Sequence, residues 1–143
     1  MSVRGASPLD SVGGAMADTG QTRTGTARLE SDGILRFRCF PGAALTEDDA
    51  RANVEACIAA SEGRLRPCLV DMSQVLGIDR SARRYHSSYE HSGRHYLAIA
   101  LLVGSPLSRV IGNFFVGLNR STFPLRLFTS EEEAIAWLRT FLE

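Results

Sequence analysis

The chain has 143 residues, of which 44% are hydrophobic and 22% are charged. This length and composition are typical of one folded domain and argue against a globally disordered chain. The formal net charge is zero, from 16 basic and 16 acidic side chains, and every basic residue is an arginine. The balance argues against a nucleic-acid binder, which needs a basic excess, and the lack of lysine excludes mechanisms that use one.

Residues 1–25 are rich in glycine, serine, threonine and alanine and contain almost no large apolar side chain. Such a segment buries too little apolar surface to offset its ordering entropy. We therefore expect a flexible tail over residues 1–25 and one domain over residues 26–143.

The cysteines and the hydropathy pattern indicate the compartment. Cys39, Cys57 and Cys68 are odd in number, form no C-x-x-C motif and lie in apolar segments, which favours buried thiols over disulfides. No apolar run approaches the ~20 residues of a membrane span, and no signal peptide is apparent. We expect a cytoplasmic protein without a membrane span.

Two strands are expected first, Thr26–Glu30 and Ile34–Phe40, on either side of a turn at Ser31–Gly33. In the second strand, apolar residues alternate with Arg36 and Arg38, so one face is buried and the other is wet.

Helices then alternate with strands. Thr46 caps a first helix that ends at Gly63, and Pro67–Met72 is a short apolar strand. Asp79 caps a second helix, which Gly93 ends.

The apolar run Tyr96–Val103 lacks alternation, which is typical of a strand buried on both faces. Ser105 and the proline after it open a third helix that runs to about Asn119. Leu125–Phe128 is a last strand, and Ser130 caps a last helix. The order ββαβαβαβα predicts an α/β fold in which four helices cover a five-stranded, mixed but mostly parallel sheet.

Two segments resemble a sequence pattern of the STAS fold, the fold of bacterial anti-sigma-factor antagonists. In that pattern, a strand ends in Asp, a loop follows, and the second helix starts with Asp-Ser. These segments are Cys68–Asp71 and Asp79–Ser81. The stretches Ser105–Phe115 and Leu127–Leu138 further resemble small stand-alone STAS-like (SpoIIAA-like) proteins of uncharacterised function. The resemblance runs from about Gly33 to the C-terminus and implies a SpoIIAA-like fold and a regulatory role through protein contacts.

One departure concerns phosphorylation. Arg80 stands where the antagonists carry their regulatory phosphoserine, and a guanidinium cannot be phosphorylated. Ser81 lies ~100° further around the helix, so it is not a direct substitute. The resemblance therefore does not extend to the kinase switch.

Metal and catalytic sites are not indicated. His86, His91 and His95 are five and four residues apart, with a helix breaker between the last two, which is poor zinc geometry. An enzyme acting through Asp71, Ser73 or His86 would need these groups to converge in a cleft. We expect no metal, no cofactor and no catalytic activity.

Polar residues at the carboxyl ends of the strands suggest a ligand edge, but helix capping is the favoured explanation for them. These residues are Asp71, Ser73, Ser105, Thr129 and Ser130.

The third helix has more apolar residues than one buried stripe needs. The excess either packs between neighbouring helices or forms a contact surface, which is made of Val110, Ile111, Phe114, Phe115 and Leu118. Gly112 and Gly117 would allow another helix to approach closely.

The sequence thus predicts a non-enzymatic regulatory module of the STAS type that binds a protein partner, including a second copy of itself, and neither nucleic acid nor membrane. The predicted surfaces are the third helix and a switch-like loop with Asp71, Ser73, Asp79, Arg80 and Ser81. The alternative is a carrier of a small apolar ligand or lipid, because CRAL-TRIO lipid-transfer domains are similar in fold to STAS domains.

Overall fold

The computed structural model describes residues 20–88, 90–119 and 123–142, with the backbone alone for residues 114–119. Its main sheet has the strand order β2-β3-β5-β7-β8, in which β2 is antiparallel to β3 and the other neighbours are parallel. The strands are β2 (Gly25–Leu29), β3 (Leu35–Cys39), β5 (Arg66–Asp71), β7 (Tyr96–Leu102) and β8 (Leu125–Phe128). The predicted α/β fold with a five-stranded, mostly parallel sheet is confirmed.

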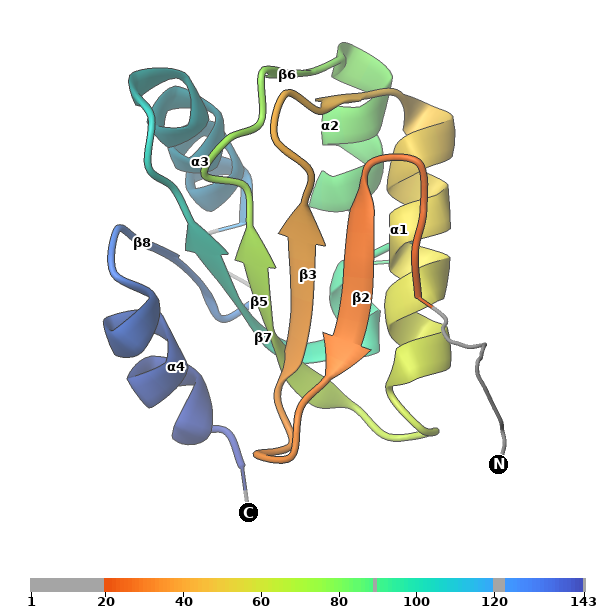
Figure 1. Ribbon diagram of the computed structural model, residues 1–143, viewed down its shortest axis with the longest axis vertical. Coiled ribbons are helices and arrows are strands. Elements are labelled where there is room, and N and C mark those ends of the chain that lie inside the picture. Colours follow the sequence, from red (N-terminus) through yellow and green to blue (C-terminus); the bar gives the residue numbers. More distant parts are fainter. Residues whose placement is uncertain (1–19, 89, 120–122, 143) are drawn as a thin grey trace.

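Four helices cover the sheet, as predicted (Figure 1). Among the described elements, α1, α2 and α3 cover one face, and α4 covers the other. The helices are α1 (Glu47–Ala60), α2 (Arg80–Ser87), α3 (Pro106–Asn119) and α4 (Glu131–Arg139), and a 3₁₀ turn, η1 (Gly93–His95), follows α2. Over the described residues, no helix has both the length and the apolar character needed to cross a bilayer.

The helices begin where the sequence predicts. The Thr46 hydroxyl accepts a hydrogen bond from the Asp49 N–H, and the Asp49 carboxylate accepts one from the Thr46 N–H, which completes a capping box. The Asp79 carboxylate caps α2 and the Ser130 hydroxyl caps α4. These bonds satisfy N–H groups that have no partner inside a helix.

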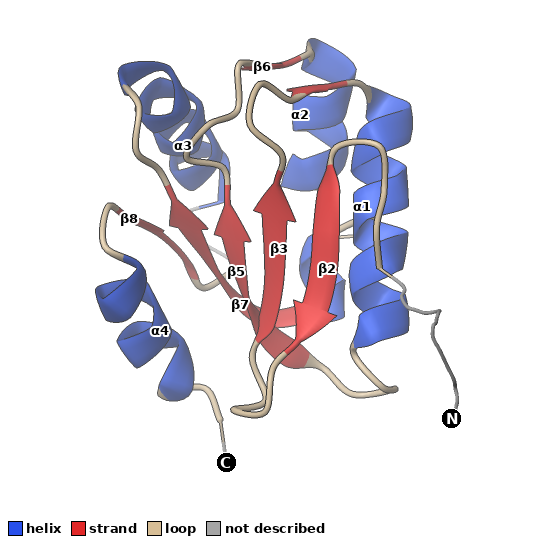
Figure 2. Ribbon diagram, in the orientation of Figure 1, coloured by secondary structure: helices blue, strands red, loops and turns tan. Residues whose placement is uncertain are grey.

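A second, very small sheet was not predicted. β4 (Ala44–Leu45) pairs with β6 (Gly77–Ile78) beyond the carboxyl ends of β3 and β5 (Figure 2). Backbone bonds join Leu76 N–H to the Ala43 carbonyl and Asp79 N–H to the Leu45 carbonyl. Strands of two residues carry no periodic sequence signal, but this pair fixes where α2 begins.

The described part of the predicted tail, residues 20–25, contacts α1. Thr24 is buried and exchanges hydrogen bonds with the Asn53 side chain, and the Arg23 guanidinium pairs with Asp49. The rest of the tail expected over residues 1–25, namely residues 1–19, lies outside the described residues.

α3 packs closely onto the sheet at Gly112. A Cβ atom at this position would lie 2.3 Å from Leu127 Cδ1 and 3.0 Å from Val103 Cγ1. The expectation that Gly112 faces a second helix is therefore wrong, because the side chains of Leu127 in β8 and of Val103 just after β7 fill the space beside it. Gly117 lies outside the residues whose surroundings are described.

Candidate functional site

An ion-pair cluster joins the sheet to α4 at the carboxyl edge. The Arg38 guanidinium, at the end of β3, donates to Asp71 Oδ2 at 3.1 Å and to both Glu131 carboxylate oxygens at 3.0 and 2.8 Å. Ser73 donates to Asp71 Oδ1 through its hydroxyl at 2.6 Å and through its N–H at 3.1 Å. One arginine therefore holds β3, β5 and α4 together, since Asp71 ends β5 and Glu131 begins α4.

This cluster alters the acid–base properties of its members. The hydrogen bonds from Arg38 lower the pKa of Glu131, and the same bonds raise the pKa of Arg38. About two-fifths of each of these two side chains is exposed, so solvent screens the interaction. The cluster is accordingly a structural clamp that loses strength in acid.

The serines at the start of α3 cap this helix. The Ser105 hydroxyl accepts from the Ser108 N–H at 3.0 Å, and the Ser108 hydroxyl accepts from the N–H groups of Gly104 and Ser105. A Cβ at Gly104 would lie 3.1 Å from the Ser73 Cβ, so the loop before α3 packs against the loop after β5. Both hydroxyls accept hydrogen bonds from backbone N–H groups, which favours the capping interpretation over a ligand edge.

The switch-like loop divides into two groups. Asp71 and Ser73 belong to the clamp, whereas Asp79 caps α2 by accepting from the Ala82 N–H at 2.8 Å. Arg80 is exposed in the first turn of α2 and Ser81 is half-buried beside it. No hydrogen bond between described residues joins the two groups, so the sequence-predicted loop is not one polar site.

Three exposed apolar side chains lie at the same edge. Leu76, Leu107 and Val110 are 64%, 45% and 67% exposed. Leu76 precedes β6, and α3, which carries the other two, packs against both β6 and α2. We name Leu76, Leu107 and Val110 the edge surface.

The predicted third-helix surface is divided as well. Val110 belongs to the edge surface, but Ile111 is buried and packs with Val103 and Leu101 in the core, so its assignment to a contact surface is wrong. The side chains of Phe114, Phe115 and Leu118 lie outside the described residues.

The described arginines fall into two groups, those with an ion pair and those without one. The side chains of Arg23, Arg36, Arg38, Arg51 and Arg66 pair with carboxylates. Arg80 and Arg84 on α2 and Arg109 on α3 are exposed, and none of them forms an ion pair with a described acidic residue. Arg109 directly precedes Val110 in α3, and α2, which carries Arg80 and Arg84, packs against α3, so unpaired guanidinium groups are present on these two helices.

The histidines and the proposed catalytic groups do not form one site. His86 lines a cavity under the helices, whereas Asp71 belongs to the clamp on the α4 side of the sheet. The His91 ring stacks on Tyr85, with centroids 5.0 Å apart. In the described part of the chain, no three metal-ligating side chains come together.

Sequence reasoning missed Arg38, Glu131, Leu76 and Leu107 as parts of this edge. The alternation along β3 shows only that Arg38 lies on the wet face, and Glu131 lies in the acidic first turn of α4, where acidic residues are common. Asp71 and Glu131 lie 33 and 93 residues after Arg38 in the chain. No local sequence pattern shows which strand and helix ends meet across such distances.

Comparisons with known proteins concern the family and the fold of the chain. A sequence model of a family described as a domain of unknown function, DUF7793, matches residues 28–142. An uncharacterized protein from the DUF3478 family with a SpoIIAA-like fold, from Shewanella loihica PV-4, is 18% identical over 82% of this chain and 97% of that chain, with a TM-score of 0.57. A protein with unknown function from Arthrobacter sp. FB24 is 37% identical over 82% of this chain and 94% of that chain, with a TM-score of 0.29. No curated protein matches. The likeness to the Shewanella protein confirms the predicted SpoIIAA-like fold.

Proposed function

The chain belongs to the DUF7793 family, a domain of unknown function, and from this premise we propose that it is a non-enzymatic regulatory module of the STAS type. It acts through protein–protein contact and associates with a second copy of itself through the edge surface. The observation that carries this proposal is the exposure of Leu76, Leu107 and Val110 on adjoining elements at one end of the fold.

Exposed apolar side chains are common singly, but apolar residues gathered on adjoining elements mark contact sites. The open guanidinium groups of Arg80 and Arg109 add a polar border, as interfaces between proteins have. Arginine is also enriched at interfaces because its planar group makes paired hydrogen bonds and stacks.

We place the module in the cytoplasm. The three cysteines are free thiols in the structure, and two of them are fully enclosed in the core. Free thiols persist in a reducing compartment, which supports this assignment.

Analytical ultracentrifugation of the full chain tests the proposal. The wild type is expected to dimerise reversibly, and Val110→Asp to weaken the dimer at least tenfold, because the new carboxylate would be desolvated in the interface. The matched control is Ile58→Asp, which changes another exposed apolar residue (42%) on α1 and leaves the dimer unchanged.

Two outcomes would contradict the proposal. A wild type that remains monomeric at roughly millimolar concentration rules out useful self-association. Equal effects of Val110→Asp and Ile58→Asp, with unchanged circular dichroism, place the contact elsewhere.

A further inference from the structure

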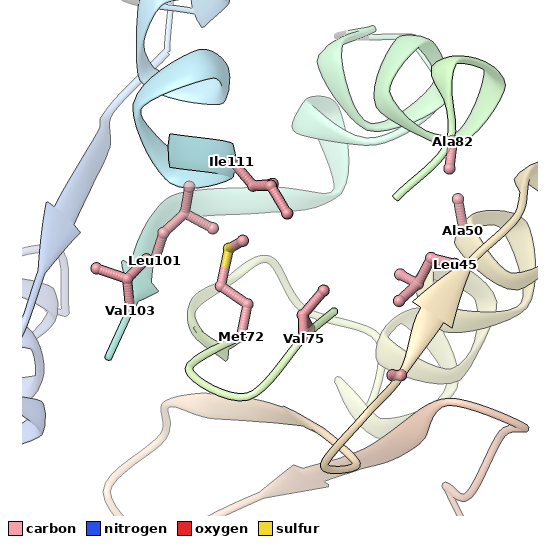
Figure 3. Packing of buried hydrophobic residues seen from close by; sticks show 9 residues of the cluster. Leu45, Ala50, Met72, Val75, Ala82, Leu101, Val103 and Ile111 are labelled. Atoms are coloured by element: carbon pink, nitrogen blue, oxygen red, sulfur yellow. The ribbon is translucent and has the colours of Figure 1, made fainter. Parts of the chain in front are cut away.

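A cavity of about 100 Å³ lies between the sheet and the three helices α1, α2 and α3. Its walls are mainly apolar, and side chains from distant segments point into this part of the core. Met72, Leu101 and Ile111 approach one another from the loop after β5, from β7 and from α3 (Figure 3). The cavity is separate from the edge surface, whose three side chains point to solvent.

The burial of the central strands shows this space independently. Val70 of β5 and Ile99 of β7 face α1–α3 from the middle of the sheet, yet both are only half-buried. Their neighbours Leu69, Ala98 and Ala100 face α4 and are fully buried. Residues in the middle of a covered sheet normally lose nearly all their exposure, so the helices leave room above Val70 and Ile99.

An irregularity in β7 points a tyrosine into this space. Arg66 pairs with Tyr96 but the next residue, Pro67, pairs with Ala98, so Leu97 is an extra residue in β7. A bulge of this kind shifts the alternation by one and turns Tyr96 toward the helices. Tyr96 lines the cavity together with His86, which comes from α2.

The surroundings disfavour charge. None of the described residues that line the cavity is an Asp, Glu or Arg. Burial lowers the pKa of His86 to about 4 and raises the pKa of Cys39 to about 12, so both groups stay neutral at physiological pH. A charged ligand would lose its hydration without gaining an ionic partner.

The volume limits the size of an occupant. An apolar cavity of about 150 Å³ holds benzene or xenon, whereas pockets for drug-sized ligands measure roughly 300–1,000 Å³. From the volume, the apolar walls and the open space above Val70 and Ile99, we propose that this cavity is a binding site for a neutral, largely apolar molecule no larger than a single six-membered ring. This is a narrower class than the lipid that the carrier alternative envisaged, and it is independent of self-association.

Benzene is the probe, with xenon as a second one, and methyl-labelled protein is observed by NMR. Benzene is expected to shift the methyl signals of Val54, Val70 and Ile99 in a saturable manner and to raise the Tm. Benzoate, the charged analogue, is expected to leave both unchanged. The methyl signals of Leu69 and Leu138, on the α4 face, serve as internal controls.

Two cavity-filling variants make the test decisive. Ile99→Phe and Val70→Leu are expected to abolish the benzene-induced shifts, and the second keeps the test open if the first does not fold. Leu65→Phe, at a residue that is 55% exposed, is the matched control and is expected to bind benzene normally. Absence of saturable shifts in the wild type, or undiminished shifts in the folded filled variants, overturns the proposal. Val110→Asp, which disrupts the proposed dimer, is expected to bind benzene normally, so the two proposals fail separately.

Discussion

On the face of the sheet that α4 covers, Leu69, Ala98 and Ala100 are fully buried, whereas on the opposite face Val70 and Ile99 of the same two strands remain half-buried. Of the described helices, one covers the first face. Three helices cover the second face, and they still leave a cavity of about 100 Å³. More helices therefore give looser packing in this molecule.

The physical reason lies in the shapes that meet. The small side chains of Ala98 and Ala100 let α4 lie close to the strands, and Ala134 and Leu138 fill the space between. The Trp137 ring closes the end of this layer against Phe128, with centroids 5.7 Å apart.

The other face is built differently. α2 has only eight residues, while α1 and α3 have 14 each. Helices of unequal length that meet above a twisted sheet leave a junction that the described side chains do not fill. We expect the α4 face to supply more stability per buried residue and the α1–α3 face to tolerate more change.

The largest expected effect compares leucines on the two faces. Leu138→Ala, on the α4 face, is expected to lower the free energy of unfolding by about 3–5 kcal/mol, because a fully enclosed side chain is replaced by a void. Leu101→Ala, beside the existing cavity, is expected to cost about 2 kcal/mol, since its side chain already lacks some neighbours. Urea unfolding measures both, and equal losses would remove the contrast between the faces.

The next effect concerns the place where the α1–α3 face is tight. Gly112→Ala is expected to cost about 1–2 kcal/mol, because the new methyl group would press on Leu127 and Val103, and the gain in helix propensity offsets only part of this strain. Asn113→Ala, at the next, exposed position, controls for propensity and is expected to be neutral or slightly stabilising. A stabilising Gly112→Ala would show that α3 can move away from the sheet.

The smallest expected change in unfolding free energy comes from breaking the clamp between β3 and α4. Arg38→Gln is expected to cost about 0.5–1 kcal/mol at pH 7, because the clamp is partly exposed. The pKa of Glu131 in the folded state lies below its ordinary 4.5, so the ion pair adds stability above that value and loses it as the pH falls through the folded-state pKa.

The loss of unfolding free energy caused by Arg38→Gln should therefore become smaller as the pH falls through the pKa of Glu131. Arg28→Gln is the matched control: Arg28 is exposed on the same sheet face and pairs with no described acidic residue. A cost that stays constant from pH 7 to about pH 3 would mean that Arg38 acts by packing and not by charge.

Much of the fold could be predicted from local patterns. The alternation in β3, the unbroken apolar run of β7 and the caps Thr46, Asp79 and Ser130 each depend on residues close together in the chain, and all are found in the structure. The site was less predictable. Of the residues predicted for the third-helix surface, Val110 is exposed but Ile111 faces the core. Apolar residues on all sides of a helix do not show which side meets the sheet.

The sequence by itself determined the order and type of the main elements, because capping and hydrophobic periodicity act over a few residues and need no distant partner. Tertiary structure alone decided the pairing of β4 with β6, the clamp between Arg38 and Glu131, and the position of Gly112 against Leu127. It also decided the cavity, which exists because three helices from separate parts of the chain meet over one sheet face. These features depend on how far apart the packed layers lie, and that distance is set by all the contacting side chains together.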